Sequence, residues 1–204
     1  MEQEKYRSII DAVDQTHSLL LVSNTTEQVF PAYFHADCGG QTSSEKNVWG
    51  KAQALNAKSS DLYCETAKKN NWSYAIDKGH LMTALRKVFF LPTDVTLSKV
   101  MPRTEGKTRA FVVDFLFSKN IFKRLSANEV RKALGFSKLR STHFVVHQEK
   151  NEFVFTGRGY GHGVGLCQWG AQRWARKGKS YKQILNHYYP GAKIRRMDPQ
   201  KFES

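Results

Sequence analysis

Residues 157–165 read GRGYGHGVG, and in this stretch a glycine occupies every second position. Alternate residues of an extended chain share one face, so we expect a strand whose backbone is bare on one side. Its other side would carry Arg158, Tyr160, His162 and Val164. Such an edge admits close approach by a bulky ligand or by a neighbouring backbone, and the pattern leaves both interpretations open.

Two common phosphate-binding motifs do not fit this run. The dinucleotide fingerprint fails because each Gly-x-Gly is followed, at the required third site, by His162, Val164 or Leu166. A phosphate loop would end in Gly-Lys-Ser or Gly-Lys-Thr, and no such triplet closes the run. The run therefore indicates another kind of binding or packing element.

The flanking sequence predicts short helices and strands. Downstream, 168–177 is closed by Gly178, and 181–188 is opened by Ser180 with Gln183 in a capping-box pattern. Upstream, hydrophobic periodicity predicts helices at 6–16, 77–90 and in a capped stretch that starts after Ser126, and strands at 18–23, 28–36, 107–117, 143–148 and 152–157. We therefore expect an α+β fold with a mixed, mainly antiparallel sheet and several short helices, two of them near the C-terminus.

A second motif, YFHADCGGQT, combines a histidine and a cysteine at the end of a predicted strand. His35 and Cys38 can aim a nitrogen and a sulfur at one point, Cys64 could supply a third ligand, and Cys167 or His162 a fourth. A metal, a disulfide between Cys38 and Cys64, and unlinked cysteines that merely pack are all open alternatives. A catalytic cysteine is a weaker one, because the spacing to a histidine does not place a base within reach.

Paired carboxylates for glycoside cleavage are hard to find. Glu45 and Glu65 lie near the histidine-cysteine motif, but neither sits in an apolar stretch that would raise its pKa for acid catalysis. We expect both to be solvated.

The chain is strongly basic, with 32 Lys and Arg against 18 Asp and Glu and a net charge of +14 over 204 residues. This charge would attract nucleic acid, an anionic membrane surface or a carboxylate-bearing wall polymer. The sequence shows no helix-turn-helix, zinc-finger or RNA-recognition signature, so a basic nucleic-acid-binding domain is a weaker alternative function and we do not expect nucleic acid as the partner. It also has no run of about 18 to 20 apolar residues, and its start, MEQEKYRSII, does not resemble a leader.

Three stretches together resemble one known family. YFHADCGGQTSSEKNVWG is similar to its first block, LSANEVRKALGFSKLRSTHFVV to the segment before the glycine run, and GRGYGHGVGLCQWGAQRWARKGKSYKQILNHYYPGAKI to its C-terminal signature. The family is that of stage II sporulation protein D, which includes the amidase-enhancer proteins. The resemblance implies a single domain over 1–204, with a loosely similar, insert-like region at about 51–106 and without the family's upstream segment.

The resemblance implies a peptidoglycan-directed protein at the periplasmic or extracytoplasmic face of the cell wall. Sporulation members cleave glycan strands as lytic transglycosylases, a reaction that needs a general acid. In the family that glutamate lies in a Glu-Met-Pro-like segment upstream of 6–16, so we expect it outside this chain. Met101-Pro102 does not match, because Val100 precedes it. A non-catalytic peptidoglycan-binding or amidase-modifying module, with a cell-wall amidase as partner, is the alternative.

The resemblance also implies site residues. Both blocks are expected to line one substrate cleft, with these residues: Tyr33, His35, Gly39, Gly40, Thr42, Arg158, Gly159, Gly161, His162, Gly163, Gly165 and Gln168. Some members bind zinc near the first block, which implies zinc as a candidate cofactor held by His35, Cys38 and Cys64. The family position of Cys167 is commonly serine.

Overall fold

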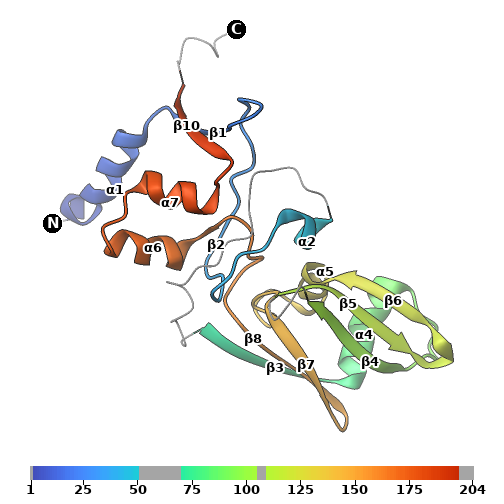
Figure 1. The fold of residues 1–204 in the computed structure, drawn as a ribbon. Coiled ribbons are helices and arrows are strands. Elements are labelled where there is room, and N and C mark those ends of the chain that lie inside the picture. Colours follow the sequence, from blue (N-terminus) through green and yellow to red (C-terminus); the bar gives the residue numbers. More distant parts are fainter. Residues whose placement is uncertain (1, 51–69, 105–108, 198–204) are drawn as a thin grey trace.

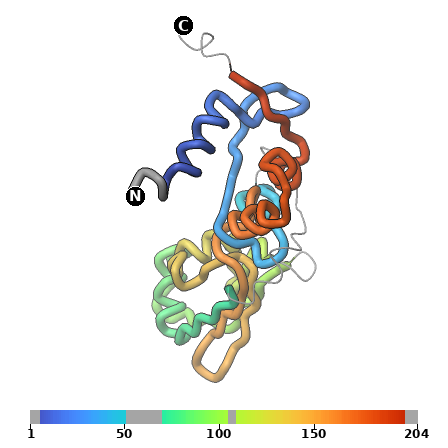
Figure 2. Tube along the Cα trace, turned by 90° about the vertical axis from the view of Figure 1, so that its left-hand side faces the viewer, coloured from blue at the N-terminus to red at the C-terminus, as the bar shows by residue number. Residues whose placement is uncertain are grey.

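The computed structural model describes residues 2–50, 70–104 and 109–197, with side chains from Tyr6 onward. Helices and strands gather into two parts, each built around a cluster of buried hydrophobic side chains. In both views one part lies above the other, and the N-terminal helix lies in the upper part, away from the two three-stranded sheets (Figure 1; Figure 2).

The first part contains two three-stranded antiparallel sheets and two helices. One sheet has the order β3 (Asn71–Asp77), β8 (Glu152–Arg158), β7 (Phe144–Glu149), and the other the order β4 (Leu97–Thr104), β5 (Ala110–Phe117), β6 (Phe122–Ser126). The helices are α4 (Lys78–Phe89) and α5 (Ala127–Leu134), and a 3-10 turn, η2 (Ser118–Asn120), joins β5 to β6. Phe153 and Phe155 alternate along β8 and Phe115 and Phe117 along β5, so each strand buries one face in the shared core.

The second part brings together the two ends of the chain. Its elements are α1 (Glu2–Thr16), β1 (Leu19–Ser23), α6 (Gln168–Arg176), α7 (Tyr181–Tyr188) and β10 (Ala192–Arg196). β1 pairs antiparallel with β10. Ile184, Tyr188 and Tyr189 are buried here together with Cys38 and Cys167. The small core of this part therefore includes both cysteines of the described residues.

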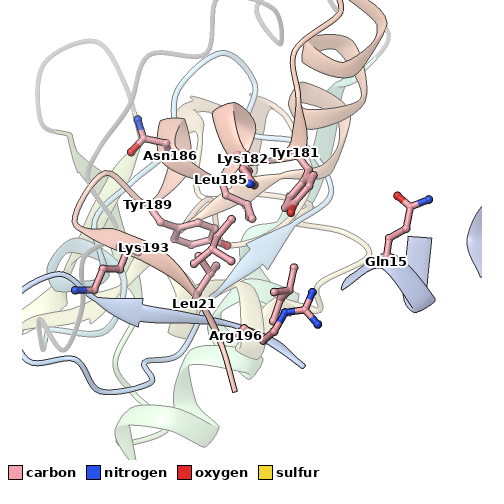
Figure 3. A pocket seen from close by; sticks show the side chains of 12 residues that line it. Gln15, Leu21, Tyr181, Lys182, Leu185, Asn186, Tyr189, Lys193 and Arg196 are labelled. Atoms are coloured by element: carbon pink, nitrogen blue, oxygen red, sulfur yellow. The ribbon is translucent and has the colours of Figure 1, made fainter. Parts of the chain in front are cut away.

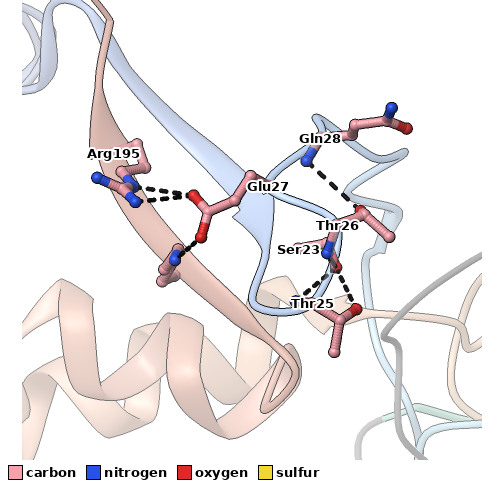
Figure 4. A network of polar contacts seen from close by, with 7 residues as sticks. Ser23, Thr25, Thr26, Glu27, Gln28 and Arg195 are labelled. Atoms are coloured by element: carbon pink, nitrogen blue, oxygen red, sulfur yellow. Dashed lines mark hydrogen bonds and ion pairs between the residues drawn. The ribbon is translucent and has the colours of Figure 1, made fainter.

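A polar turn after β1 stabilises the pairing of β1 with β10. The hydroxyl of Ser23 accepts hydrogen bonds from the backbone N–H groups of Thr25 and Thr26, at 3.2 and 3.1 Å. Glu27 then forms ion pairs with Lys193 and Arg195 of β10 (Figure 4). The turn thereby holds the C-terminal strand by charge as well as by backbone bonds.

A cavity of about 570 Å³ lies between α7 and the β1–β10 pair. Tyr181, Lys182 and Leu185 reach into it from α7, and Leu21 and Arg196 face them from the two strands (Figure 3). Its lining combines apolar side chains with three basic ones, Lys182, Lys193 and Arg196.

The predicted fold class is confirmed, because the described helices and strands form an α+β fold with mainly antiparallel sheets. The predicted hairpin is present as β7 and β8, and the two C-terminal helices are α6 and α7. The predicted strand at 28–36 is reduced to β2 (Phe34–His35). Across the described ranges, no helix combines the length and apolar character that crossing a membrane requires.

The expected strand through the glycine run is wrong. β8 ends at Arg158, and Gly159, Gly161, Gly163 and Gly165 all have positive φ, from 70° to 110°. Only glycine adopts such angles without strain, so the alternation produces a folded loop rather than an extended edge.

Candidate functional site

The two sequence motifs meet in space. β2 pairs in parallel with β9 (Leu166–Cys167), and further bridges join Asp37 to Tyr160 and Ser43 to Val164. His35 Nδ1 lies 3.1 Å from the carbonyl oxygen of Val164, which is 129 positions away in the chain. The histidine-cysteine loop and the glycine run therefore form one structural unit.

The glycines of this unit make room for the chain itself. A Cβ at Gly159 would lie 2.7 Å from the carbonyl oxygen of Asp37, and one at Gly161 would lie 2.8 Å from the Cβ of His35. A Cβ at Gly163 would lie 2.5 Å from the guanidinium carbon of Arg109. Close self-packing thus accounts for these three glycines, and a direct role in holding substrate stays a prediction for them.

Two histidines occupy the centre of the unit. The rings of His35 and His162 are 5.7 Å apart, and His162 Nδ1 accepts the N–H of Val164 at 3.1 Å. Burial, followed by the neighbouring His35, Arg131 and Arg109, lowers the pKa of His162 to about 4. At neutral pH this ring is therefore uncharged.

Aromatic side chains border the histidine pair. The ring of Trp49 lies 4.7 Å from that of Tyr33 and 5.2 Å from that of His162. Trp49 closes α2 (Glu45–Trp49), a short helix that begins at the N-cap Ser44, and the ring is 39% exposed. A partly exposed aromatic face beside neutral hydrogen-bonding groups is suited to an uncharged ring such as a sugar.

A histidine and two cysteines gather beneath this surface. One ligand atom from each of His35, Cys38 and Cys167 lies within 4.8 Å of the others, and all three residues are buried. Cys167 caps α6, and its sulfur accepts the N–H groups of Gly170 and Cys38 at 3.3 and 3.2 Å. One imidazole and two sulfurs form a donor set that suits zinc. Cys64, the third expected ligand, lies outside the described residues.

An arginine that lies outside the two sequence motifs, Arg109, supports the histidine-cysteine loop. Buried Arg109 donates to the carbonyl oxygens of Gln41 and Cys38 and to the hydroxyl of Thr142. No motif surrounds Arg109, so its role follows only from the fold. Burial, then Arg109 and Arg158, lower the pKa of His143 to about 3.

The remaining expected site residues differ in exposure. Thr42, Gly39 and Gly40 are buried, while Gln168 is exposed at the start of α6. Glu45 was expected to be solvated, but it is only 3% exposed because α2 turns its first residue inward. Glu65 lies outside the described residues.

Comparison with known protein families gives a match that spans both motifs. A protein family described as "Domain of unknown function (DUF8618)" matches residues 4–165, which include the histidine-cysteine loop and the glycine run. The chain belongs to this family.

Curated relatives extend the comparison. An uncharacterized protein of Brachyspira hyodysenteriae is 31% identical over 189 residues, covering 92% of this chain and 48% of the relative. The amidase enhancer of Bacillus subtilis is 25% identical, covering 90% and 32%, and its stage II sporulation protein D is 26% identical, covering 96% and 53%. This DUF8618 member is thus related to the sporulation and amidase-enhancer proteins, as predicted, and spans about half or less of their length.

Proposed function

We propose that the chain is a peptidoglycan-directed domain that acts in cell-wall remodelling, at the extracytoplasmic face. The observation that carries this proposal is the meeting of the two motifs, which sets the rings of Tyr33, Trp49 and His162 side by side above the buried His35. A glycan strand offers apolar ring faces and hydroxyl groups, which match an aromatic border and the neutral imidazole of His162. The names of the relatives support a role of this kind.

We further propose that the protein takes part in glycan cleavage of the lytic transglycosylase type. It requires a general acid at the scissile oxygen. His162 stays neutral at physiological pH, and both carboxylate oxygens of Asp37 accept bonds, one from the N–H of Gly39 and one from the side chain of Asn70. These groups position the site, and the resemblance assigns the acid to the family's upstream segment.

Modification of an amidase is the second candidate. One relative is named an amidase enhancer, and the match covers 90% of this chain. In this alternative the same surface holds the wall polymer while a partner amidase cuts it.

Zinc is the proposed cofactor of the buried cluster. His35, Cys38 and Cys167 would hold it, and the hydrogen bond between His35 Nδ1 and the Val164 carbonyl orients the ring in the way that metal-bound histidines are commonly oriented. Bound there, zinc would supply a structural cross-link between β2 and β9. Cys64 remains the predicted further ligand.

A sedimentation experiment with purified cell-wall sacculi tests the proposal. The chain is expected to co-sediment at physiological salt, and Tyr33→Ala and Trp49→Ala are expected to weaken binding about tenfold because each removes an aromatic contact. Tyr181→Ala is the matched control, since Tyr181 is a 45% exposed aromatic on α7 that is not part of the Tyr33, Trp49 and His162 group.

The products distinguish the candidates. Release of anhydro-sugar ends from sacculi supports cleavage, whereas binding without release, together with faster digestion by an added amidase, supports the modifier. Because a charge of +14 attracts any polyanion, DNA is added as a competitor. Binding that DNA abolishes, and that Tyr33→Ala leaves unchanged, would reject a wall-directed function.

A further inference from the structure

A groove of about 580 Å³ crosses the outer face of the β3–β8–β7 sheet, next to the histidine-cysteine loop. Residues directly opposite each other on antiparallel strands share a face, and Asn71 pairs with Arg158 while Ser73 and Val145 both pair with Thr156. Their side chains therefore stand together on this face. The groove thus combines these hydrogen-bonding side chains with apolar surface, from the exposed Val145 and from Trp72 and Phe144.

Arg158 is held firmly at one end of the groove. Its stem packs against Gly39, where an added Cβ would come within 3.0 Å of the arginine Cγ. Its Nε donates to the ring of His143, 3.1 Å from Nε2, and its carbonyl oxygen accepts the hydroxyl of Ser141 at 2.7 Å. Since a guanidinium can only donate, this contact uses a lone pair of an uncharged imidazole.

The outward nitrogens of Arg158 are available to a ligand. Within the described ranges no acceptor bonds to either of them, and no carboxylate pairs with this arginine. A guanidinium whose Nε is already fixed presents two parallel N–H groups, a geometry that matches both oxygens of a carboxylate. His143 is thus a positioning residue, and Arg158 is the binding residue.

We propose that this groove is a subsite for a sugar that bears a carboxylate, with the acid on Arg158 and the ring over Asn71, Ser73 and Thr156. The inference rests on the proposed function, because the muramic acid units of peptidoglycan expose a lactyl carboxylate wherever the stem peptide has been removed, and the glucosamine units have no such group. It deepens that function by assigning one sugar type to one face of the molecule.

The test compares two soluble tetrasaccharides by calorimetry. One alternates N-acetylglucosamine with N-acetylmuramic acid that has a free lactyl group, and the other contains N-acetylglucosamine alone. The acid-bearing one is expected to bind about tenfold more tightly, and Arg158→Gln is expected to remove that preference. Arg158→Lys should restore only part of it, because an ammonium keeps the charge but lacks the fork. Arg176→Gln, an exposed arginine on α6, is the control.

A second arm uses D-lactate alone and follows the side-chain Nε–H signal of Arg158 by NMR, with chloride at equal ionic strength as the reference. If lactate shifts this signal while neither tetrasaccharide binds, the subsite stands and the wall-directed function fails. If lactate leaves the signal unchanged, or if Arg158→Gln weakens both tetrasaccharides equally in a folded variant, the subsite is overturned.

Discussion

Gly157 shows at the scale of one residue how closely this sheet is packed. It lies opposite Trp72 on β3 and Phe144 on β7, and the indole of Trp72 fills the space that a side chain would take. A Cβ there would lie 2.4 Å from the indole Cζ2 and 2.5 Å from the carbonyl oxygen of His143. The backbone carbonyl cannot move away without disturbing the strand pairing. Only glycine therefore fits at this position, although its φ is one that any residue can adopt.

Gly157→Ala is therefore expected to lower the free energy of unfolding by about 1–3 kcal/mol through overpacking, measured by urea denaturation. Gly79→Ala is the control, because its φ is also ordinary and a Cβ there meets only Asp77 Oδ1, at 3.2 Å. Equal effects of the two substitutions would show that the indole does not occupy this space.

His143, which is buried, and His162, which is partly buried, predict how the free energy of unfolding depends on pH. Burial is the main cause that lowers the pKa of His143 to about 3 and that of His162 to about 4, both from 6.5. The unfolded chain therefore takes up protons below about pH 6.5 that the folded chain takes up only near its lowered pKa values. The contribution of the two neutral histidines to the free energy of unfolding is complete above pH 6.5, and it is lost as the pH falls toward 4.

Between pH 6 and 4.5 the free energy of unfolding is expected to fall by about 1.4 kcal/mol per pH unit for each histidine. Urea titrations at several pH values measure this slope. His143→Asn should reduce it by about half, and His147→Asn, which changes an exposed histidine of β7, should leave it unchanged. An unaltered slope in His143→Asn would contradict the burial argument.

At the scale of the element, α7 depends on its first turn. The hydroxyl of Ser180 accepts a hydrogen bond from the backbone N–H of Gln183, and the side-chain oxygen of Gln183 accepts one from the backbone N–H of Ser180. Ser180→Ala is expected to cost about 1 kcal/mol of unfolding free energy in thermal or urea unfolding. Lys182→Ala lies in the same turn outside the capping box and serves as the control. A smaller loss for Ser180→Ala than for Lys182→Ala would reject the capping role.

Elements with local signals were the ones that the sequence predicted well. The capping boxes at Ser126 and Ser180 and the turn at Lys150 each involve residues within a few positions of one another, so their chemistry is visible in the chain. Strands β3 and β10 were missed, because their pairing partners, β8 and β1, are far away in sequence. β6 was also missed, although it pairs with the preceding strand β5. The parallel pairing of β2 with β9 has no local signal at all.

At the scale of the whole molecule, the sequence showed the two motifs but not how they meet in space. Both motifs were recognised from their residues. Their contact depends on a folded loop in which alternate glycines have positive φ, and a two-residue period suggested an extended strand instead. Arg109 and His143 were not among the predicted site residues, because each is a single polar residue just before a strand and only the fold gives it a role.

The buried His35, Cys38 and Cys167 cluster leads to a prediction about the folded molecule as a whole. These residues join the loop after β2 to the start of α6, so a bound metal would link segments that are far apart in the chain. Protein purified without chelator is expected to contain about one zinc ion per chain by mass spectrometry, and chelation should lower the melting temperature.

Cys38→Ser and Cys167→Ser are each expected to lose most of the zinc, whereas His80→Asn, an exposed histidine of α4, should retain it. Cys64→Ser then decides whether that residue is a further ligand, since loss of zinc in this variant would place it in the set. Retention of zinc in the Cys38→Ser, Cys167→Ser double variant would reject the cluster as its site. A structural metal contributes to stability through the ligands that it holds. If the melting temperature is the same with and without chelator, β2 and β9 are therefore held together without a metal.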